Sequence, residues 1–335
     1  MKKFFCLFTS LLSIITFNSN TTKLTSYQCR SYVVIDGYSG KILEGKDYSL
    51  KRSVASISKI MTAIIALESE KSFYVYTISE DVTGIEGSSI YLEVGEQYRL
   101  IDLVYGLLLR SGNDAAYAIA KFVSDDINSF ISLMNVKAKE LGMTNTSFSN
   151  PCGLDIEDEG NISTAYDMAL LMKYCMNNDL FQEIISTKKY QFRNRVYYNK
   201  NKLLNTYDYY LGGKTGFTSK ARRTLISASK KDDQYLIVCS LDCGSDYAFH
   251  KDIFERYYER YRYIVFLYKG RNYIDEYIFE SDMVIGLRLP VDKLKNVVKK
   301  YFINPITGTL VISIIDKDGK ESYNETFYNI KCIRN

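Results

Sequence analysis

A serine and a lysine three residues apart, Ser56 and Lys59, have the types and spacing of a catalytic pair. On a helix this spacing places both side chains on one face. A serine hydroxyl is a weak nucleophile that needs an adjacent base, and a lysine can be that base when burial and a second cation lower its pKa. The pair therefore predicts a serine nucleophile with an amine base. The alternative is a helix-capping serine beside a solvated lysine.

A second motif, Ser111-Gly112-Asn113, lies in a short break between two expected helices. In such a break a side chain can point into a cleft. The Ser111 hydroxyl could relay a proton to a leaving group, and the Asn113 amide could hold a substrate carbonyl and Lys59. Ordinary turn and capping chemistry is the alternative.

A third motif, Lys214-Thr215-Gly216, follows two glycines and precedes an expected hairpin, so it fits an edge strand of a sheet. An edge strand can pair with an extended peptide, and Gly216 would let the two backbones approach closely. Lys214 could be the second cation near Lys59, and Lys214 with Thr215 could bind a terminal carboxylate. The alternative is the polar start of an ordinary strand.

The surrounding pattern predicts the elements that must position these motifs. Apolar runs predict a hairpin over 32–44 and a second over 223–241, and residues 56–68 predict a helix that is buried on nearly all sides. Further helices are expected at 101–110, 115–122, 126–141 and 163–176. Strands, then many helices, then strands predict an α+β fold: one antiparallel sheet closed by both chain ends, with helical layers inserted.

Length and composition limit the class of protein. The 335 residues predict about two domains, and 43 basic against 39 acidic residues give a net charge of +4, too small for a nucleic-acid-binding protein. Lys2 and Lys3 precede an apolar run to Phe17, which predicts an export signal or a retained N-terminal anchor over 1–26. We expect a catalytic domain over 27–263, a small β-rich domain over 264–335, and a protein that works outside the cytoplasm.

Cysteine and histidine usage argues against a metal. Six cysteines follow Cys6, which permits disulfides in an exported protein, but no pair has the spacing of a zinc site and the chain has one histidine. We expect neither a metal nor a cofactor.

Several longer stretches carry a resemblance to a known family. They are GSSIYL at 87–92, LLRSGNDAA at 108–116, NPCGL at 150–154, STAYDMA at 163–169, NKNKLL at 199–204 and GKTGFTSKA at 213–221. With the three motifs, they make residues 30–260 similar to the low-molecular-weight penicillin-binding proteins that are serine D-alanyl-D-alanine carboxypeptidases. The resemblance implies a catalytic domain with the penicillin-binding and serine β-lactamase fold, followed by a β-rich domain.

The resemblance also implies roles, a substrate and inhibitors. Ser56 would be the acylated nucleophile, Lys59 its base, Ser111 the proton relay and Asn113 a substrate contact. Lys214 and Thr215 would bind the carboxylate, and Gly216 would allow the close approach of the substrate. The backbone N–H groups of Ser56 and Phe217 would form an oxyanion hole. The expected partners are peptidoglycan stem peptides and β-lactam antibiotics.

Departures from the family pattern keep alternatives open. Cys152 and Arg222 are unusual at their positions, and the arginine that some members carry after the last strand is missing, so Arg223, His250 or Lys251 could replace it. These departures leave room for a non-catalytic wall-binding homologue. A class A-like β-lactamase would need a glutamate that activates water, and Glu157 with Asn161 has a suitable spacing.

Residues 291–302 alternate apolar and basic positions. They predict either a basic amphipathic helix that contacts a membrane surface or an ordinary element of the small C-terminal domain.

Overall fold

The computed structural model describes residues 27–155, 160–274, 277–294, 298–304, 306–307, 309–315, 321–327 and 331–334. The expected export signal at 1–26 and the segment 156–159 lie outside the described residues. Within the described part of the chain, no helix is both long and apolar enough to span a bilayer.

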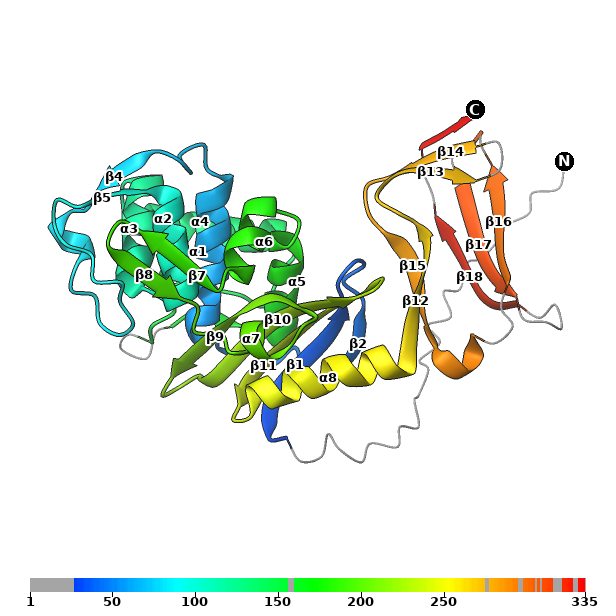
Figure 1. Cartoon of the computed structure of the whole chain (residues 1–335), viewed down its shortest axis with the longest axis horizontal. Helices are drawn as coiled ribbons and strands as arrows, with labels where there is room; N and C mark the ends of the chain where they lie inside the picture. The colour runs from blue at the N-terminus through cyan, green and yellow to red at the C-terminus, as the bar shows by residue number, and fades with distance from the viewer. Residues whose placement is uncertain are drawn as a thin grey trace, which may run out of the picture.

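A five-stranded antiparallel sheet forms the centre of the catalytic part of the chain (Figure 1). Its strand order is β2 (Ile42–Lys46), β1 (Cys29–Asp36), β11 (Gln234–Cys243), β10 (Arg222–Lys231) and β9 (Tyr210–Thr218). Strands β1 and β2 precede the helices in sequence and β9–β11 follow them, which confirms the prediction that both chain ends close one sheet. The strand with the Lys-Thr-Gly motif, β9, is at the edge of this sheet.

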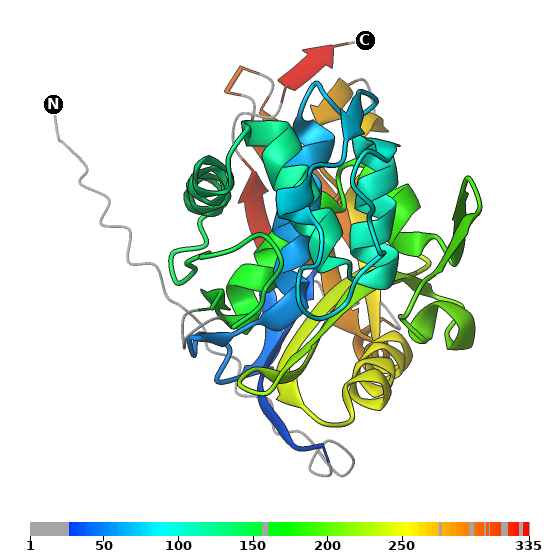
Figure 2. The ribbon, with the colours of Figure 1, turned by 90° about the vertical axis from the view of Figure 1, so that its left-hand side faces the viewer.

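A helical layer covers one face of the sheet and contains the larger apolar core. It comprises α1 (Lys59–Glu68), α2 (Leu100–Tyr105), α3 (Asn113–Ser124), α4 (Ile127–Glu140), α5 (Ala165–Cys175) and α6 (Asp179–Ser186). Figure 2 shows these helices gathered in front of the sheet. Every residue of α1 from Lys59 to Leu67 is buried, because α2–α6 all contact this helix. The predicted core helix is therefore confirmed.

The opposite face of the sheet is covered by α8 (Asp246–Arg260), with the short α7 (Leu203–Thr206) beside it. Phe249, Ile253, Phe254 and Tyr257 form the buried stripe of α8, at helical spacing. A disulfide between Cys29 and Cys243 joins the start of β1 to the end of β11. Because the linked residues are 214 positions apart, closure of so long a loop stabilises the fold by roughly 5 kcal/mol in the chain-entropy description.

Three small two-stranded sheets brace the catalytic part. They are β3 (Arg52–Ser53) with β6 (Ile162–Ser163), β4 (Val75–Thr77) with β5 (Gln97–Arg99), and β7 (Lys189–Phe192) with β8 (Arg195–Tyr198).

The described residues after α8 are rich in strands and form a separate apolar core. The strands are β12 (Tyr261–Leu267) with β15 (Ile285–Pro290), β13 (Gly270–Ile274) with β14 (Tyr277–Ser281) and β19 (Lys331–Arg334), and β16 (Val298–Asn304) with β17 (Thr309–Ile315) and β18 (Glu321–Phe327). Arg288 on β15 forms a buried ion pair of 2.9 Å with Asp36 at the end of β1. We propose that the catalytic domain ends at residue 263 and that the β-rich domain begins at residue 264. Strand β12 runs across this boundary.

The prediction of an amphipathic helix over residues 291–302 is wrong. Residues Val291–Lys293 form one 3-10 turn, and β16 begins at Val298. In a strand, alternate side chains share a face, so Val298, Lys300 and Phe302 lie together and all three are exposed. Pairing with β17 over seven residues provides the backbone hydrogen bonds that a helix would otherwise supply.

Candidate active site

The nucleophile candidate lies on a 3-10 turn, η2 (Ala55–Ser58), that leads directly into α1. Lys59 Nζ is 2.9 Å from Ser56 Oγ, so the two groups face each other as their spacing predicts. Lys59 is completely buried. Ala55, immediately before the serine, has a left-handed backbone with φ of 51°, which costs about 1–2 kcal/mol for a residue with a side chain. The nucleophile is thus presented by a strained turn.

The Lys59 amine has two further partners, Asn113 Oδ1 at 2.7 Å and the carbonyl oxygen of Cys152. A neutral amine has two N–H groups and one lone pair. If Asn113 and the Cys152 carbonyl accept the two N–H groups, the lone pair faces Ser56 Oγ. Burial lowers the pKa of Lys59 to about 8, with a smaller lowering contribution from the charge of Lys200. The surroundings therefore raise the share of the neutral form, which can accept a proton.

Ser111 and Lys214 form a second pair, with Lys214 Nζ 3.0 Å from Ser111 Oγ. Ser111 ends a π-helical turn, η4 (Gly106–Arg110), in the left-handed conformation with φ of 64°. This conformation turns its hydroxyl out of the helix and toward β9. Burial first, and then the charges of Lys59 and Lys200, lower the pKa of Lys214 well below its ordinary value. The structure thus brings together Ser56, Lys59, Ser111, Asn113 and Lys214, as the motifs predicted.

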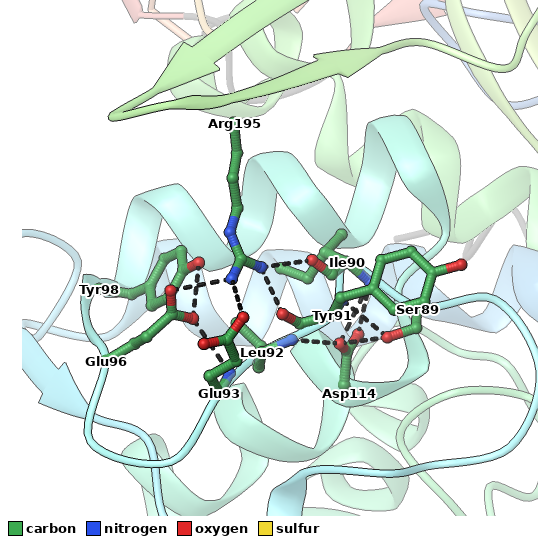
Figure 3. Close-up of polar contacts among 9 residues, drawn as sticks. All are labelled: Ser89, Ile90, Tyr91, Leu92, Glu93, Glu96, Tyr98, Asp114 and Arg195. Carbon is green, nitrogen blue, oxygen red and sulfur yellow. Dashed lines mark hydrogen bonds and ion pairs between the residues drawn. The ribbon is translucent and has the colours of Figure 1, made fainter.

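Asp114, the residue after Asn113, fixes the loop around residues 89–92 (Figure 3). The Asp114 carboxylate accepts hydrogen bonds from Ser89 Oγ at 2.5 Å and from the backbone N–H groups of Ile90 and Leu92 at 3.1 Å. Asn113 Nδ2 in turn donates to the Glu86 carbonyl at 2.5 Å. Asn113 is therefore oriented on one side by Lys59 and on the other by this loop.

Arg195 on β8 holds the same loop from the opposite side (Figure 3). Its guanidinium donates to the Ile90 carbonyl at 2.8 Å and to the Tyr91 carbonyl, and it pairs with Glu96 at 2.9 Å and Glu93 at 3.3 Å. A loop fixed from both sides gives the cleft a defined wall.

The edge strand β9 lies directly against the nucleophile turn. A Cβ on Gly216 would be 2.9 Å from the Ser56 nitrogen and 2.5 Å from Thr224 Oγ1, so only glycine fits without displacement. Phe217 follows, with its side chain 62% exposed. This approach puts the backbone of 216–217 beside Ser56, where the two expected oxyanion-hole N–H groups belong.

A cavity of about 450 Å³ opens at this junction. It is lined by Ser56, Ser88, Ser111, Lys200, Lys202, Thr215, Gly216, Phe217, Arg223, Asp246 and Tyr247. Four further lining residues carry a hydroxyl group or a positive charge, and the sequence analysis did not predict them as part of the site. They are Ser88, Lys200, Lys202 and Tyr247. The resemblance of residues 87–92 and 199–204 to the sequences of the family was the signal that could have found Ser88, Lys200 and Lys202.

Among the three candidates for the missing arginine, only Arg223 lines this cavity. Its guanidinium is paired with Asp246 at 2.7 Å and lies 5.6 Å from the centre of the Tyr247 ring. His250 is buried between Ser227 Oγ and Ser240 Oγ, at 2.8 Å from each. Lys251 Nζ lies over the Tyr207 ring.

The two unusual residues have simple structural explanations. The site uses the backbone carbonyl of Cys152, while its buried thiol contacts Asn150 Oδ1 at 3.3 Å, so the hydrogen bond to Lys59 does not depend on the type of side chain at this position. Arg222 has a left-handed backbone with φ of 59° and an exposed side chain. The conformation explains why glycine would suit the position, and the exposure explains why arginine is tolerated.

The glutamate that a class A-like β-lactamase needs, Glu157, lies outside the described residues. Asn161 has a structural environment: its side chain accepts from the backbone N–H groups of Ser149 and Asn150 and donates to the Asn150 carbonyl. Within the described part of the chain, no group of three or more histidine, cysteine or acidic side chains is arranged to hold a metal ion.

Comparison with known proteins agrees with this geometry. The profile of the peptidase S11 family, described as D-alanyl-D-alanine carboxypeptidase, matches residues 18–245. The chain is 35% identical over 227 residues to the D-alanyl-D-alanine carboxypeptidase DacF of Bacillus subtilis, covering 64% of this chain and 58% of that protein. It is 36% identical over 240 residues to DacC of Escherichia coli, covering 68% and 59%. The match thus spans less than two thirds of these curated relatives.

Solved structures show the same similarity. A D-alanyl-D-alanine carboxypeptidase from Mycobacterium tuberculosis is 27% identical, with a TM-score of 0.66 over 69% of this chain and 91% of that one. Penicillin-binding protein 5 from Haemophilus influenzae is 23% identical, with a TM-score of 0.76 over 91% of this chain and 97% of that one. The second likeness concerns the fold alone, and it extends over the strand-rich C-terminal region.

Proposed function

The chain belongs to the peptidase S11 family of D-alanyl-D-alanine carboxypeptidases, and from this premise we propose that it removes the terminal D-alanine from peptidoglycan stem pentapeptides. The observation that carries the proposal is the Lys59 amine, which is buried and 2.9 Å from Ser56 Oγ while two other acceptors bind its N–H groups.

In the proposed acylation step, Ser56 Oγ attacks the carbonyl of the D-alanyl-D-alanine bond and its proton passes to Lys59. The backbone N–H groups of Ser56 and Phe217 stabilise the oxyanion that forms. Ser111, which is hydrogen-bonded to Lys214, delivers a proton to the departing amine as the C–N bond breaks. The proton that Lys59 took from Ser56 then replaces it on Ser111, so that Lys59 is neutral again. D-Alanine leaves, and an ester remains on Ser56.

In the second step, water hydrolyses this ester. Lys59 accepts a proton from the water, the hydroxyl adds to the ester carbonyl, and Ser56 leaves with a proton as the free hydroxyl. Dividing one difficult hydrolysis into two easier steps is the advantage of covalent catalysis. No cofactor takes part in either step of this proposal.

The charge of the cavity suits a substrate that ends in a free carboxylate. Lys214, Thr215 and Arg223 would bind it, with Arg223 in the role of the missing family arginine. A carboxylate offers about four acceptor positions, so several donors can share it. Asn113, held by Lys59 and the Glu86 carbonyl, would contact the substrate's peptide backbone.

A β-lactam presents an amide carbonyl and a carboxylate at similar positions, and would acylate Ser56. The test uses a fluorescent penicillin together with D-alanine release from a pentapeptide. We expect wild-type protein to be labelled and to release D-alanine, and Ser56→Ala to do neither. A protein that binds pentapeptide without releasing D-alanine would instead be the non-catalytic homologue, and rapid penicillin turnover would indicate a β-lactamase.

We also propose that the protein works outside the cytoplasm, in the wall, with β16 as a peripheral membrane contact. Val298, Lys300 and Phe302 share an exposed face of that strand, which combines apolar and basic character. Sedimentation with vesicles of anionic phospholipid would test this contact. We expect binding that Phe302→Ser weakens, and binding equal to that of the variant would exclude the face.

A further inference from the structure

Asp155 has no assigned role, and its carboxylate joins two segments of the chain that form the active site. Oδ1 accepts a hydrogen bond from Ser53 Oγ at 2.7 Å, and Oδ2 accepts one from Thr218 Oγ1. Ser53 precedes the nucleophile by three residues, and Thr218 directly follows Phe217. The carboxylate is therefore a bridge between the nucleophile turn and the end of β9.

The two hydrogen bonds of this bridge have a defined direction. A carboxylate can only accept, so both hydroxyls donate to it. Thr218 Oγ1 also accepts from the Ala221 N–H at 3.0 Å, which leaves its own proton for Asp155. Hydrogen bonds to a charged group are roughly twice as strong as neutral ones. Ser53 is buried, Thr218 is half-buried, and neither of them lines the catalytic cavity.

The loop that carries Asp155 packs tightly against the nucleophile turn. Gly153 has a left-handed backbone with φ of 84°, and a Cβ there would overlap the Ala55 carbonyl oxygen. The carbonyl of Cys152 accepts from the Lys59 amine, and Asn150 Oδ1 fixes the loop by accepting from the Gly153 N–H at 2.6 Å. Asp155 thus extends from a loop that is already in register with the catalytic base.

We propose that Asp155 is a positioning residue that holds the backbone N–H groups of Ser56 and Phe217 at the separation that an oxyanion requires. Both donors must lie about 2.7–3.1 Å from one oxygen, although they belong to segments far apart in sequence. A displacement of about 1 Å can cost about 100-fold in rate. The inference rests on the proposed function and adds to it a residue that acts through the backbone and not on the substrate.

The first test separates binding of benzylpenicillin from acylation of Ser56, by measuring labelling rates over a range of penicillin concentrations. We expect Asp155→Ala to lower the acylation rate constant about 100-fold. The dissociation constant of the non-covalent complex should stay within about threefold of wild type, because the oxyanion forms only later. Asp155→Asn can accept from Thr218 and donate to Ser53 Oγ, so it should stay within about tenfold of the wild-type rate constant.

A peptide boronic acid provides a readout that a merely structural role would not move. Its boron binds Ser56 Oγ and becomes tetrahedral, with an oxygen at the position of the oxyanion, so it resembles the transition state. Across the Asp155 variants, the loss of boronic acid affinity should match the loss in acylation rate constant. Wild-type affinity in a variant that acylates slowly would overturn the inference.

The two arms of the bridge are tested separately and together. Ser53→Ala and Thr218→Val each remove one hydroxyl, whereas Thr218→Ser keeps the hydroxyl and should acylate like wild type. A bridge fails when either arm is cut, so the double variant should be no more than about threefold slower than the slower single variant. Single effects that multiply in the double variant would show two independent contacts and overturn the inference.

Asp126→Ala is the matched control. This carboxylate caps α4, accepting from the Ser129 N–H at 2.9 Å, and does not line the cavity. The variant should lower the unfolding temperature and leave the acylation rate constant at the wild-type value. An equal fall in both aspartate variants, or a wild-type rate constant in Asp155→Ala, would overturn the inference.

Thermal unfolding of each variant checks that it is folded. Should Asp155→Ala not fold, the two single-arm variants and their double decide the question by themselves. None of these results affects the proposed function, which fails only if wild-type protein is not labelled or releases no D-alanine.

Discussion

The backbone of Gly216 lies against the amide of Ser56, so that a Cβ on Gly216 would be only 2.9 Å from the Ser56 nitrogen. The edge strand and the nucleophile turn thereby form one surface, although their residues are 160 positions apart. Thr224 on the neighbouring strand supports the contact, since its Oγ1 donates to the Val54 carbonyl at 3.1 Å. The fit depends on glycine because no side-chain atom separates the two backbones.

Gly216→Ala is expected to slow acylation by penicillin about 100-fold, the usual effect of losing one oxyanion-hole donor. The added methyl group must push the Ser56 amide or Thr224 aside, which would also lower the free energy of unfolding by about 1–3 kcal/mol. Labelling rates and urea unfolding measure the two effects. Gly244→Ala is the matched control, since a Cβ there meets no atom within 4 Å. Equal labelling rates for the two variants would contradict the proposed contact.

The pKa of Lys59, lowered to about 8 by burial, predicts the pH dependence of acylation. A base acts in its neutral form, so the acylation rate constant should rise about tenfold per pH unit below pH 8 and level off above it. Stopped-time labelling between pH 5.5 and 9 measures the profile. A rate that does not change over this range would exclude Lys59 as the base.

Neighbouring cations provide the control for this profile. Lys200→Met removes a charge that lowers the pKa of Lys59, so the bend in the profile should move to higher pH. Lys251→Met removes the same charge at a position where the ammonium lies over the Tyr207 ring, and should leave the bend in place.

Arg223 is expected to contribute to carboxylate binding. Arg223→Ala should raise the KM for pentapeptide about tenfold, because one charge-assisted hydrogen bond is lost. Arg223→Lys should recover part of this loss, although lysine cannot reproduce a forked contact. Steady-state D-alanine release measures KM. Lys251→Ala changes the net charge equally and should keep the wild-type KM; a similar rise there would indicate long-range attraction in place of direct binding.

The three motifs and the order of strands and helices were predictable from sequence because each depends on local spacing. The edge position of β9 followed from the two glycines and the hairpin after it. Contacts made by backbone atoms were not predictable in the same way. The Cys152 carbonyl reaches Lys59 because Asn150 folds its own loop, with its Oδ1 accepting from the Gly153 N–H at 2.6 Å, and no property of the Cys152 side chain indicates it.

The replacement for the missing arginine remained open for a related reason. Residue type alone makes Arg223, His250 and Lys251 equivalent donors, whereas burial depends on the direction of each side chain. For His250 a signal was present: with Phe249, Ile253, Phe254 and Tyr257 it lies on the apolar stripe of a helix. Reading that stripe would have placed His250 in the core. The direction of Arg223 depends on the pairing of β10 with β9, where it is opposite Phe217, and that register is set by tertiary contacts.

His250 is the chain's only histidine, and its burial predicts how stability depends on pH. Burial lowers its pKa from 6.5 to about 3, since a charged imidazole between Ser227, Ser240 and the Phe254 ring would lose its hydration. The unfolded chain binds a proton near pH 6.5 and the folded chain does not. The stabilising effect is therefore complete above pH 6.5 and is lost as the pH falls toward 3.

Between pH 7 and 5 the free energy of unfolding should fall by about 2 kcal/mol through this one group. Urea unfolding at both pH values measures the change in wild type and in His250→Asn, whose amide can still bond a serine but does not titrate. The variant should be less stable at pH 7, because it fills the site less well, yet its stability should differ little between the two pH values. Since no second histidine can supply the same change, an equal pH dependence in the variant would show that His250 is protonated in the folded protein.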